Sequence, residues 1–359
     1  MLDAAGFDVD VVTLAGTHLH RSREIRAVTL APSLSDALVV AAEQSRADRY
    51  DWIIIGDDAT LRLLRVGEGL DADDQVRLAP VTDPDFLDQL GSKVVLAQRL
   101  ERLAVGSPRF RLAASAEEAA AATHDFGGRA LLKPDAGSGG AGIISATGPK
   151  EAAVGWHLLA ARQESPAERD GAERVVLVQE FIEGRLVDVS GIFFNGRLVH
   201  YTYAHMFSAD GGHAASSLRH YYPTSTVSPA IVDELSVIGA GLRLHGFANV
   251  TCIESPDGTS RRYFEADARP NLWAAIGAEF GDDPVARLRL WFDEGRTDLA
   301  AVDNSPSATA TTPPPQPREV AMFKRLPRRD LIRNRHGVWR DIPWRSPEAR
   351  RLFWRAILP

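Results

Sequence analysis

A glycine-rich segment that directly follows a lysine is the feature that most constrains this chain. The segment reads LLKPDAGSGGAGII from Leu131 to Ile144, so that Lys133 ends an apolar run. The small residues of its loop are Gly137, Ser138, Gly139, Gly140 and Gly142. Because glycines carry no Cβ atom, successive backbone N–H groups can converge on an anion, and the lysine can place a positive charge on phosphate oxygens. The pattern indicates a phosphate site, and it is equally compatible with a tight glycine hairpin that binds no ligand.

Two familiar phosphate-binding loops do not fit this segment. A Walker A loop ends in Gly-Lys-Ser/Thr, whereas here the lysine comes first, and a dinucleotide-binding fingerprint is followed by a helix. The residues after Gly142 are Ile-Ile-Ser-Ala, which are partly β-branched and strand-like. We therefore predict a flap made of a strand, a glycine loop and a second strand.

The composition is that of an ordinary globular protein with several subdomains. Of the 359 residues, 45% are hydrophobic and 25% are charged, and the formal net charge is -7, so we expect no nucleic-acid partner. The single cysteine, Cys252, excludes an intramolecular disulfide and a zinc site built on paired thiolates. No apolar run approaches the roughly 20 residues of a membrane span, and the N-terminus does not resemble a signal peptide. We expect no membrane partner and a cytoplasmic location.

The first ninety residues alternate strand-like and helical patterns, which predicts a small parallel α/β domain over residues 1–90. Strands are expected over Val9–Leu14 and Trp52–Gly56, and helices over Leu34–Gln44 and Ala59–Val66.

Two aspartates, Asp57 and Asp58, follow the apolar run Ile53–Ile55 and Gly56. An open α/β sheet exposes its ligand crevice at this end of its strands, so the aspartates could contact a substrate. Alternatively, Asp58 is the N-cap of the helix that begins at Ala59, and this second interpretation is favoured.

The rest of the chain alternates helices with strands. Helices are predicted over Ser92–Val105, Ser115–Thr123, Glu151–Gln163 and Ala230–Leu244. Strands are predicted over Arg174–Gln179, over the hairpin Leu186–Phe194 and Arg197–Tyr203 around Asn195-Gly196, and over the hairpin Val250–Ile253 and Arg262–Glu265. Residues 300–318 are rich in Ala, Thr, Ser and Pro and are predicted to be a linker. Residues 319–359 carry three tryptophans and are predicted to dock as a C-terminal segment.

Four motifs occur in one order along the chain. They are Gly91-Ser92-Lys93, Lys133-Pro134 with the glycine flap, Gln179-Glu180-Phe181-Ile182-Glu183-Gly184, and Glu265-Ala266-Asp267-Ala268-Arg269. This set resembles the ATP-grasp superfamily of ATP-dependent ligases over about Gly91 to Trp291. The resemblance implies a mixed α/β (α+β) fold over residues 91–299 that holds the nucleotide between two sheets, with a lid subdomain at about 127–180. Residues 1–90 would be the α/β domain that precedes it.

The resemblance also implies an ATP site. Lys93 and Lys133 would neutralise phosphate charge, and the flap would supply backbone donors and exclude water. Backbone groups of Glu180 and Ile182 would bind the adenine, and the side chain of Gln179 or Glu180 would face its amino group.

Asp188 is the candidate for the ribose, because Leu186 and Val187 stand nearby where relatives often have an acid. An ordinary sheet edge with exposed acids is the alternative interpretation of this region.

A pair of carboxylates near the end of the resemblance predicts a metal site. Glu265 and Asp267 are two apart on a strand and project from one face, which suits Mg²⁺, with Mn²⁺ as an alternative ion. Arg269 would be the catalytic cation that stabilises the transferring phosphoryl group or an oxyanion. Thr251 stands where the family usually has an acid or glutamine, with Asn249 two residues earlier, and Asp267 replaces the family's commoner asparagine.

The loop from His205 to Pro223 would meet the acceptor substrate. Arg219 is the candidate for binding a carboxylate, because a guanidinium matches it in a bidentate way. His213 and His220 are candidate bases or polar loop residues, and Asn271 is a further candidate substrate contact.

Together these features predict an ATP- and Mg²⁺-dependent ligase that activates a small-molecule carboxylate as an acyl-phosphate and joins it to an amine. ADP and phosphate would be released, and the sequence is compatible with a homodimer. A nucleotide-binding module that has lost catalysis and acts as a sensor or scaffold is the alternative, which Thr251 keeps open. A dinucleotide-dependent oxidoreductase is disfavoured, because no helix follows the glycine loop.

Overall fold

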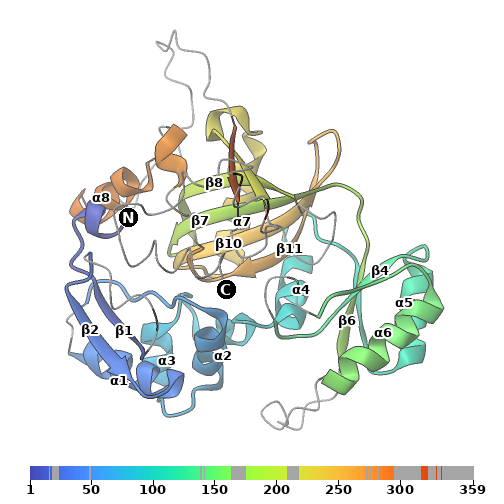
Figure 1. Cartoon of the computed structure of the whole chain (residues 1–359), viewed down its shortest axis with the longest axis horizontal. Coiled ribbons are helices and arrows are strands. Elements are labelled where there is room, and N and C mark those ends of the chain that lie inside the picture. The colour runs from blue at the N-terminus through green and yellow to red at the C-terminus, as the bar shows by residue number, and fades with distance from the viewer. Residues whose placement is uncertain are drawn as a thin grey trace.

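The computed structural model has a small N-terminal α/β unit, a four-stranded sheet with two helices, and a six-stranded sheet (Figure 1). It describes residues 1–15, 17, 24–47, 50–137, 140, 142–162, 175–207, 218–271, 274, 276–280, 283–294, 317–321, 329 and 333. Within these ranges no helix is long and apolar enough to cross a membrane. The mixed α/β class predicted from the sequence is confirmed.

The N-terminal unit contains a parallel strand pair, as the alternation of patterns predicted. Strand β1 (Asp10–Leu14) pairs in parallel with β2 (Ala27–Ala31). Helices α1 (Leu34–Arg46), α2 (Asp58–Val66) and α3 (Ala72–Leu78) pack beside them. The sequence analysis did not identify β2, whose side chains are mostly exposed and show no apolar alternation.

The strand predicted over Trp52–Gly56 is wrong, because these residues belong to no strand of the described structure. Their apolar side chains instead pack on two sides. Trp52 stacks on Phe247 with ring centroids 5.2 Å apart, whereas Ile55 lies in the main hydrophobic core. The apolar run is therefore explained by packing between the N-terminal unit and the large sheet.

The predicted N-cap role of Asp58 is also wrong. The N-cap of α2 is Asp57, whose Oδ1 accepts a hydrogen bond from the Thr60 N–H at 2.9 Å. Its Oδ2 accepts another from the Thr60 hydroxyl at 2.7 Å. Asp57 has the extended backbone that is usual for an N-cap, and Asp58 is the first helical residue. The Asp58 carboxylate is left to bind elsewhere.

The four-stranded sheet has the strand order β3-β6-β4-β5, and three of its strands lie within or next to the lid subdomain predicted at about 127–180. Its strands are β3 (Phe110–Ala113), β4 (Ala130–Lys133), β5 (Ile144–Ala146) and β6 (Val176–Glu180). Helices α5 (Ala116–Asp125) and α6 (Pro149–Arg162) pack on each other and on this sheet (Figure 1). Strands β4 and β5 are antiparallel, with Leu132 opposite Ile144, so the predicted strand-loop-strand flap is confirmed.

The six-stranded sheet has the order β11-β10-β7-β8-β9-β12. Its strands are β7 (Arg185–Phe194), β8 (Arg197–Phe207), β9 (Leu218–Tyr222), β10 (Gly246–Glu254), β11 (Arg261–Asp267) and β12 (Arg318–Ala321). The predicted Asn195-Gly196 hairpin is present, with φ of 47° and 79° at the two turn residues. Positive φ at both positions is what a type I′ turn requires.

Two strands of this sheet were not predicted. Strand β9 lies within the segment from His205 to Pro223 that was expected to be a loop, and β12 begins at Arg318, the last residue of the predicted linker. Most of residues 300–359 lies outside the described ranges, as does His213.

Two further helices complete the fold. Helix α7 (Ala230–Gly241) packs on the large sheet and ends three residues before the predicted boundary, and α8 (Pro284–Glu294) also contacts β8. Helix α4 (Lys93–Glu101) lies between the large sheet and the lid and contacts β11 (Figure 1). It ends four residues before its predicted boundary.

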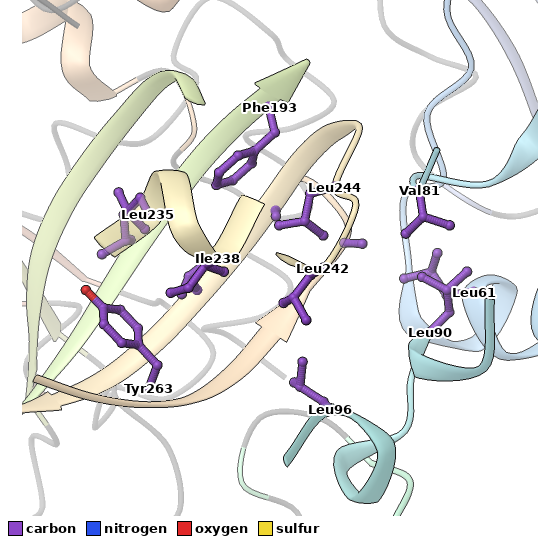
Figure 2. Close-up of a cluster of buried hydrophobic side chains, with 14 of the residues drawn as sticks. Leu61, Val81, Leu90, Leu96, Phe193, Leu235, Ile238, Leu242, Leu244 and Tyr263 are labelled. Carbon is purple, nitrogen blue, oxygen red and sulfur yellow. The ribbon is translucent and has the colours of Figure 1, made fainter. Parts of the chain in front are cut away.

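The main hydrophobic core joins the N-terminal unit to the large sheet. Buried side chains from both parts belong to one cluster (Figure 2). Members are Leu61, Leu64, Val81 and Leu90 from the first ninety residues, Leu235 and Ile238 from α7, and Val189, Phe193 and Tyr263 from the sheet. Burial of each such side chain contributes about 1.5–3 kcal/mol. This shared core fixes α2 relative to β11.

A buried polar cluster lies on the face of the large sheet that packs against α7. Glu254 accepts a hydrogen bond from the Tyr203 hydroxyl at 2.7 Å and forms an ion pair with Arg261 at 3.3 Å, and its Oε2 lies 3.3 Å from Nε2 of His205. Arg261 also pairs with Glu234 of α7 at 3.1 Å. The cluster ties α7 to three strands through charge-assisted hydrogen bonds.

Candidate active site

Asp135 ties the N-terminus of α4 to the start of the flap. Its Oδ1 accepts hydrogen bonds from the Ser92 hydroxyl at 2.7 Å and the Val94 N–H at 2.9 Å. Its carbonyl accepts from the Lys93 N–H at 3.0 Å. Two unsatisfied N–H groups of the helix are thereby paired, and a carboxylate is favourable at a helix N-terminus. The sequence analysis missed Asp135, although an acid directly after Lys133-Pro134 was a usable signal.

Two lysines and a carboxylate converge on one pocket beneath the flap. Its lining residues come from α4, β4, the flap and β11: Lys93, Lys133, Gly137, Gly140, Ile143, Phe264 and Glu265. The Lys93 ammonium donates a hydrogen bond to the Gly137 carbonyl. The structure therefore brings together residues of three of the four motifs. Ser138 and Gly139 of the predicted flap lie outside the described residues.

Lys133 is a buried cation with a neutral hydrogen-bond partner. The residue is only 4% exposed, and its Nζ donates a hydrogen bond to Gln179 Oε1 at 2.6 Å. Nζ also lies 4.4 Å from the centroid of the Phe264 ring. Burial lowers the pKa of Lys133 to about 8; the charge of Glu265 raises this pKa and that of Lys93 lowers it further. A bound anion would stabilise the charged form of Lys133, which burial disfavours.

The hinge residues lie where the chain passes from the small sheet to the large one. Glu180 ends β6, and its carboxylate accepts hydrogen bonds from the Arg109 N–H at 2.8 Å and the Arg109 Nε at 2.6 Å. Ile182 lies in the connection between β6 and β7. Gln179 points its Oε1 at Lys133, so its side chain joins the predicted adenine hinge to the predicted phosphate site.

The predicted metal ligands belong to two cross-strand rows on one face of the large sheet. In the first row Glu265 is opposite Thr251, and Thr251 is opposite Asp188 on the next strand. In the second row Asp267 is opposite Asn249. Residues two apart on a strand point to the same side. Thr251 is thus the residue that the preceding strand places beside Glu265, as its spacing predicted. The next carboxylate in the first row is Asp188.

Asp188 and Arg219, predicted for the ribose and for a substrate carboxylate, form one ion pair. Arg219 Nε donates to Asp188 Oδ2 at 2.7 Å, and Asp188 is 1% exposed. In this conformation the buried Asp188 carboxylate binds Arg219. Sequence spacing could not show this, because the two residues lie on strands that are not neighbours in the sheet.

His220 points away from the face of the large sheet that carries Glu265 and Asp267. It is opposite His205 in the ladder, whereas its neighbours Arg219 and Tyr221 point to the other side of the sheet. Its ring packs against Phe207 with centroids 4.6 Å apart. The alternation of side chains along β9 therefore places His220 on the opposite face of the sheet from Arg219, and its role as a substrate contact stays a prediction.

Arg269 is held between two carboxylates that come from distant parts of the chain. Its guanidinium forms a bidentate pair with Asp58 of α2, in which Nη2 lies 3.0 Å from Oδ2. The same Nη2 lies 3.2 Å from Asp267 Oδ2. The sequence analysis named Arg269 and Asp267 but not Asp58 as a partner, because 211 positions separate Asp58 from Arg269.

The carboxylates of Asp58, Glu265 and Asp267 crowd together near Arg269. Burial raises the pKa of Asp267 well above its usual range, and the charges of Glu265 and Asp58 raise it further, while Arg269 lowers it. Within the described residues no three acids, histidines or cysteines lie close enough to hold a metal by themselves. Mg²⁺ commonly takes one or two carboxylates and completes its shell with phosphate and water oxygens. Glu265 and Asp267 fit that pattern.

Asn271 links the second row of polar side chains. Its Nδ2 donates to Asn249 Oδ1 at 2.9 Å and to the Ser190 hydroxyl. Asn271 thus orients side chains next to Asp267 on the face of the sheet that carries the predicted metal ligands.

The fold is shared with solved structures at low sequence identity. The biotin carboxylase domain of Hydrogenobacter thermophilus 2-oxoglutarate carboxylase, solved with MgADP, ADP and bicarbonate, has a TM-score of 0.60 and 12% identity, covering 82% of this chain and 66% of that one. Biotin carboxylase from Campylobacter jejuni gives 0.59 and 14%, covering 82% and 68%. L-amino acid ligase from Bacillus licheniformis gives 0.53 and 13%, covering 80% and 68%.

The present chain spans about two thirds of the length of these structures. No family model matches it, and the comparison with curated proteins finds no match. The likeness establishes an ATP-grasp fold, which confirms the fold predicted from the four motifs.

Proposed function

We propose that this chain is an ATP- and Mg²⁺-dependent ligase that activates a carboxylate as an acyl-phosphate and joins it to an amine. The observation that carries the proposal is the convergence of Lys93, Lys133 and Glu265 on one pocket beneath the glycine flap. A buried lysine costs stability unless it binds an anion. The ATP-grasp fold supports the identification of that anion as a nucleotide phosphate.

The two lysines have separate tasks in this proposal. ATP carries about four negative charges that must be neutralised before a carboxylate can approach its terminal phosphorus. Lys133 would contribute a fixed charge from the interior of the lid. Lys93 would contribute a second charge from the N-terminus of α4, whose position relative to the flap is set by Asp135.

Glu265 and Asp267 would hold the metal, and the crowding of their charges supports this role. Bound Mg²⁺ would supply charge neutralisation at the phosphate oxygens. Small-molecule substrates are consistent with the bicarbonate bound in one solved structure of this fold and with the amino acid ligase named for another.

In the first chemical step an oxygen of the substrate carboxylate attacks the γ-phosphorus, and the bond to the oxygen of ADP breaks. In the second step the amine lone pair attacks the acyl carbon and inorganic phosphate leaves, while the amine loses a proton to solvent or base. Arg269 would donate hydrogen bonds to the charged oxygens in these steps. Its two carboxylate partners hold it next to the metal ligands.

The test is incubation of the purified protein with ATP, Mg²⁺ and mixtures of carboxylic acids and amines. We expect ADP and phosphate to form only with a suitable acid. An ¹⁸O label in the acid carboxylate should then appear in the released phosphate, because that oxygen bridges to phosphorus in the acyl-phosphate. Formation of AMP and pyrophosphate would contradict the mechanism. Glu265→Gln serves as the matched inactive variant.

The second candidate is a nucleotide-binding module without catalysis. Thr251 favours it, because a hydroxyl stands between Glu265 and Asp188 where an acid or glutamine would strengthen the metal site. Calorimetry with Mg·ATP on the wild type and on Glu265→Ala and Asp267→Ala distinguishes the two. Tight metal-dependent binding with no turnover in any substrate mixture would favour the module.

A further inference from the structure

The N-terminal unit reaches the proposed active site through one side chain. Asp58, the first residue of α2, binds the guanidinium of Arg269 with both carboxylate oxygens. The neighbouring Asp57 caps the helix, so Asp58 is not needed for that purpose. Both partners of the Asp58–Arg269 pair are largely buried, with about one fifth of each side chain exposed.

The geometry of the pair suits orientation. A guanidinium is a planar fork, and two parallel hydrogen bonds to a carboxylate fix both its position and its plane. A single hydrogen bond, such as the one from Arg269 to Asp267, leaves the plane free to rotate.

Asp267 Oδ2 accepts a single hydrogen bond from Arg269 and belongs to a proposed metal ligand. A cation bound by this carboxylate would draw on the same negative charge and would weaken its interaction with Arg269. The bidentate Asp58 pair involves no proposed metal ligand. The orientation of Arg269 during the reaction then depends on α2.

Helix α2 is a rigid support for this contact. Leu61 and Leu64 of the same helix are 1% and 0% exposed and belong to the main core shared with α7 and the large sheet. A site residue supported by a packed element keeps its position better than one held by a loop.

We infer that Asp58 is a positioning residue that fixes the guanidinium of Arg269 beside the metal ligands, so that the N-terminal unit completes the active site. The inference rests on the proposed ligase function. It also explains why Asp58, which follows the apolar run Ile53–Ile55, lies at the site although that run is not a strand of the sheet.

The test compares Asp58→Asn with Asp57→Asn. The first keeps the shape of the side chain but weakens the bidentate ion pair, whereas the second keeps a good helix cap. We expect Asp58→Asn to lower kcat by about 100-fold, since a misplacement of about 1 Å can have that effect. KM for ATP should change less than about twofold, Asp58→Glu should recover part of kcat, and Asp57→Asn should behave as wild type.

A second measurement does not depend on turnover. In a protein with ¹⁵N-labelled arginine, the Nε–H signal of Arg269, assigned with Arg269→Lys, should be protected from exchange in the wild type and in Asp57→Asn. It should lose that protection in Asp58→Asn.

The outcomes separate the two ideas. If the wild type forms no ADP with any substrate mixture, the proposed function fails, and the Nε–H measurement still decides whether Asp58 fixes Arg269. If the wild type turns over and Asp58→Asn matches it, or loses activity only in proportion to its folded fraction, the positioning role of Asp58 is overturned. An unprotected Nε–H signal in the wild type also overturns it.

Discussion

Replacement of Lys133 by methionine should stabilise the ligand-free protein while weakening nucleotide binding. Methionine has a similar length and no charge, so Lys133→Met removes a buried ammonium without leaving a large cavity. The ammonium is unfavourable in the ligand-free protein because its residue is 4% exposed and its hydrogen-bond acceptor, Gln179, is neutral. The same ammonium is useful only when phosphate binds.

The size of the effect follows from the pKa. Burial lowers the pKa of Lys133 from 10.5 to about 8, and each pKa unit corresponds to about 1.36 kcal/mol. The folded protein therefore carries a penalty of about 3 kcal/mol at neutral pH for keeping this lysine charged. Removal of the lysine also leaves Gln179 Oε1 buried without its donor, which costs about 1–3 kcal/mol. The expected net gain at pH 7 is about 0–2 kcal/mol.

The pH dependence is the sharper measurement, because the Gln179 contribution does not titrate. The unfolded chain holds the Lys133 proton up to about pH 10.5, whereas the folded chain releases it above about pH 8. Between these values the unfolded state binds more protons, so the stability of the wild type rises with pH. The free energy of unfolding of Lys133→Met minus that of the wild type should fall by about 3 kcal/mol between pH 7 and pH 10.5.

Urea unfolding followed by circular dichroism at several pH values measures this difference. Lys93→Met is the control: Lys93 lines the same pocket but is only partly buried, so its removal should weaken ATP binding without the same stabilisation. Lys133→Met should weaken binding at least roughly 10-fold, as expected for loss of a hydrogen bond to a charged group. A stability difference that does not change with pH would refute the argument that Lys133 is a desolvated cation.

Three other predictions follow from individual sites. Gly196→Ala should destabilise by at least about 1 kcal/mol more than Gly128→Ala, because both have positive φ but only a Cβ at Gly196 would meet backbone, 2.9 Å from the Cα of Ala240; equal losses in thermal unfolding would contradict this. Burial raises the pKa of Glu254, but hydrogen bonds from a histidine and a tyrosine and the charge of a nearby arginine outweigh it and lower this pKa to about 2. Glu254→Gln should therefore destabilise the protein above about pH 4.5, and the difference from wild type should disappear as pH falls toward 2. A difference in urea unfolding that persists at pH 2 would show that the negative charge of Glu254 is not its cause. Asp267→Ala, which removes the oxygen ligand, should abolish Mg²⁺-dependent nucleotide binding in calorimetry while leaving the ligand-free protein at least as stable, because it relieves crowded negative charge. A large loss of stability would show that the Asp267 carboxylate supports the fold.

Elements with strong local signals could be predicted from the sequence. The Asn195-Gly196 hairpin was predicted because a type I′ turn needs two residues that tolerate positive φ. The flap strands β4 and β5 were predicted because an apolar run precedes the glycine loop and a partly β-branched run follows it. Strands β2 and β9 were missed because their patterns are weak and their pairing is decided by neighbours elsewhere in the chain.

The candidate site divides in the same way. Lys93, Lys133, Glu265 and Asp267 were named from motif order, and the structure brings the two lysines and Glu265 to one pocket. Their roles in binding ATP and metal remain predictions. Asp188 and Arg219 were predicted for the ribose and for a substrate carboxylate, whereas their mutual ion pair depends on the strand order β7-β8-β9.

By itself the sequence determined the types of residue that this protein brings to its chemistry and the order in which they occur. Those properties depend on neighbouring residues, through periodicity, turn chemistry and short motifs. Only the tertiary structure decided which of these residues meet. Three side-chain contacts show this: Asp58 with Arg269, Asp188 with Arg219, and Lys133 with Gln179. Each joins residues between 31 and 211 positions apart. Such contacts are set by core packing and strand register, for which no local pattern exists.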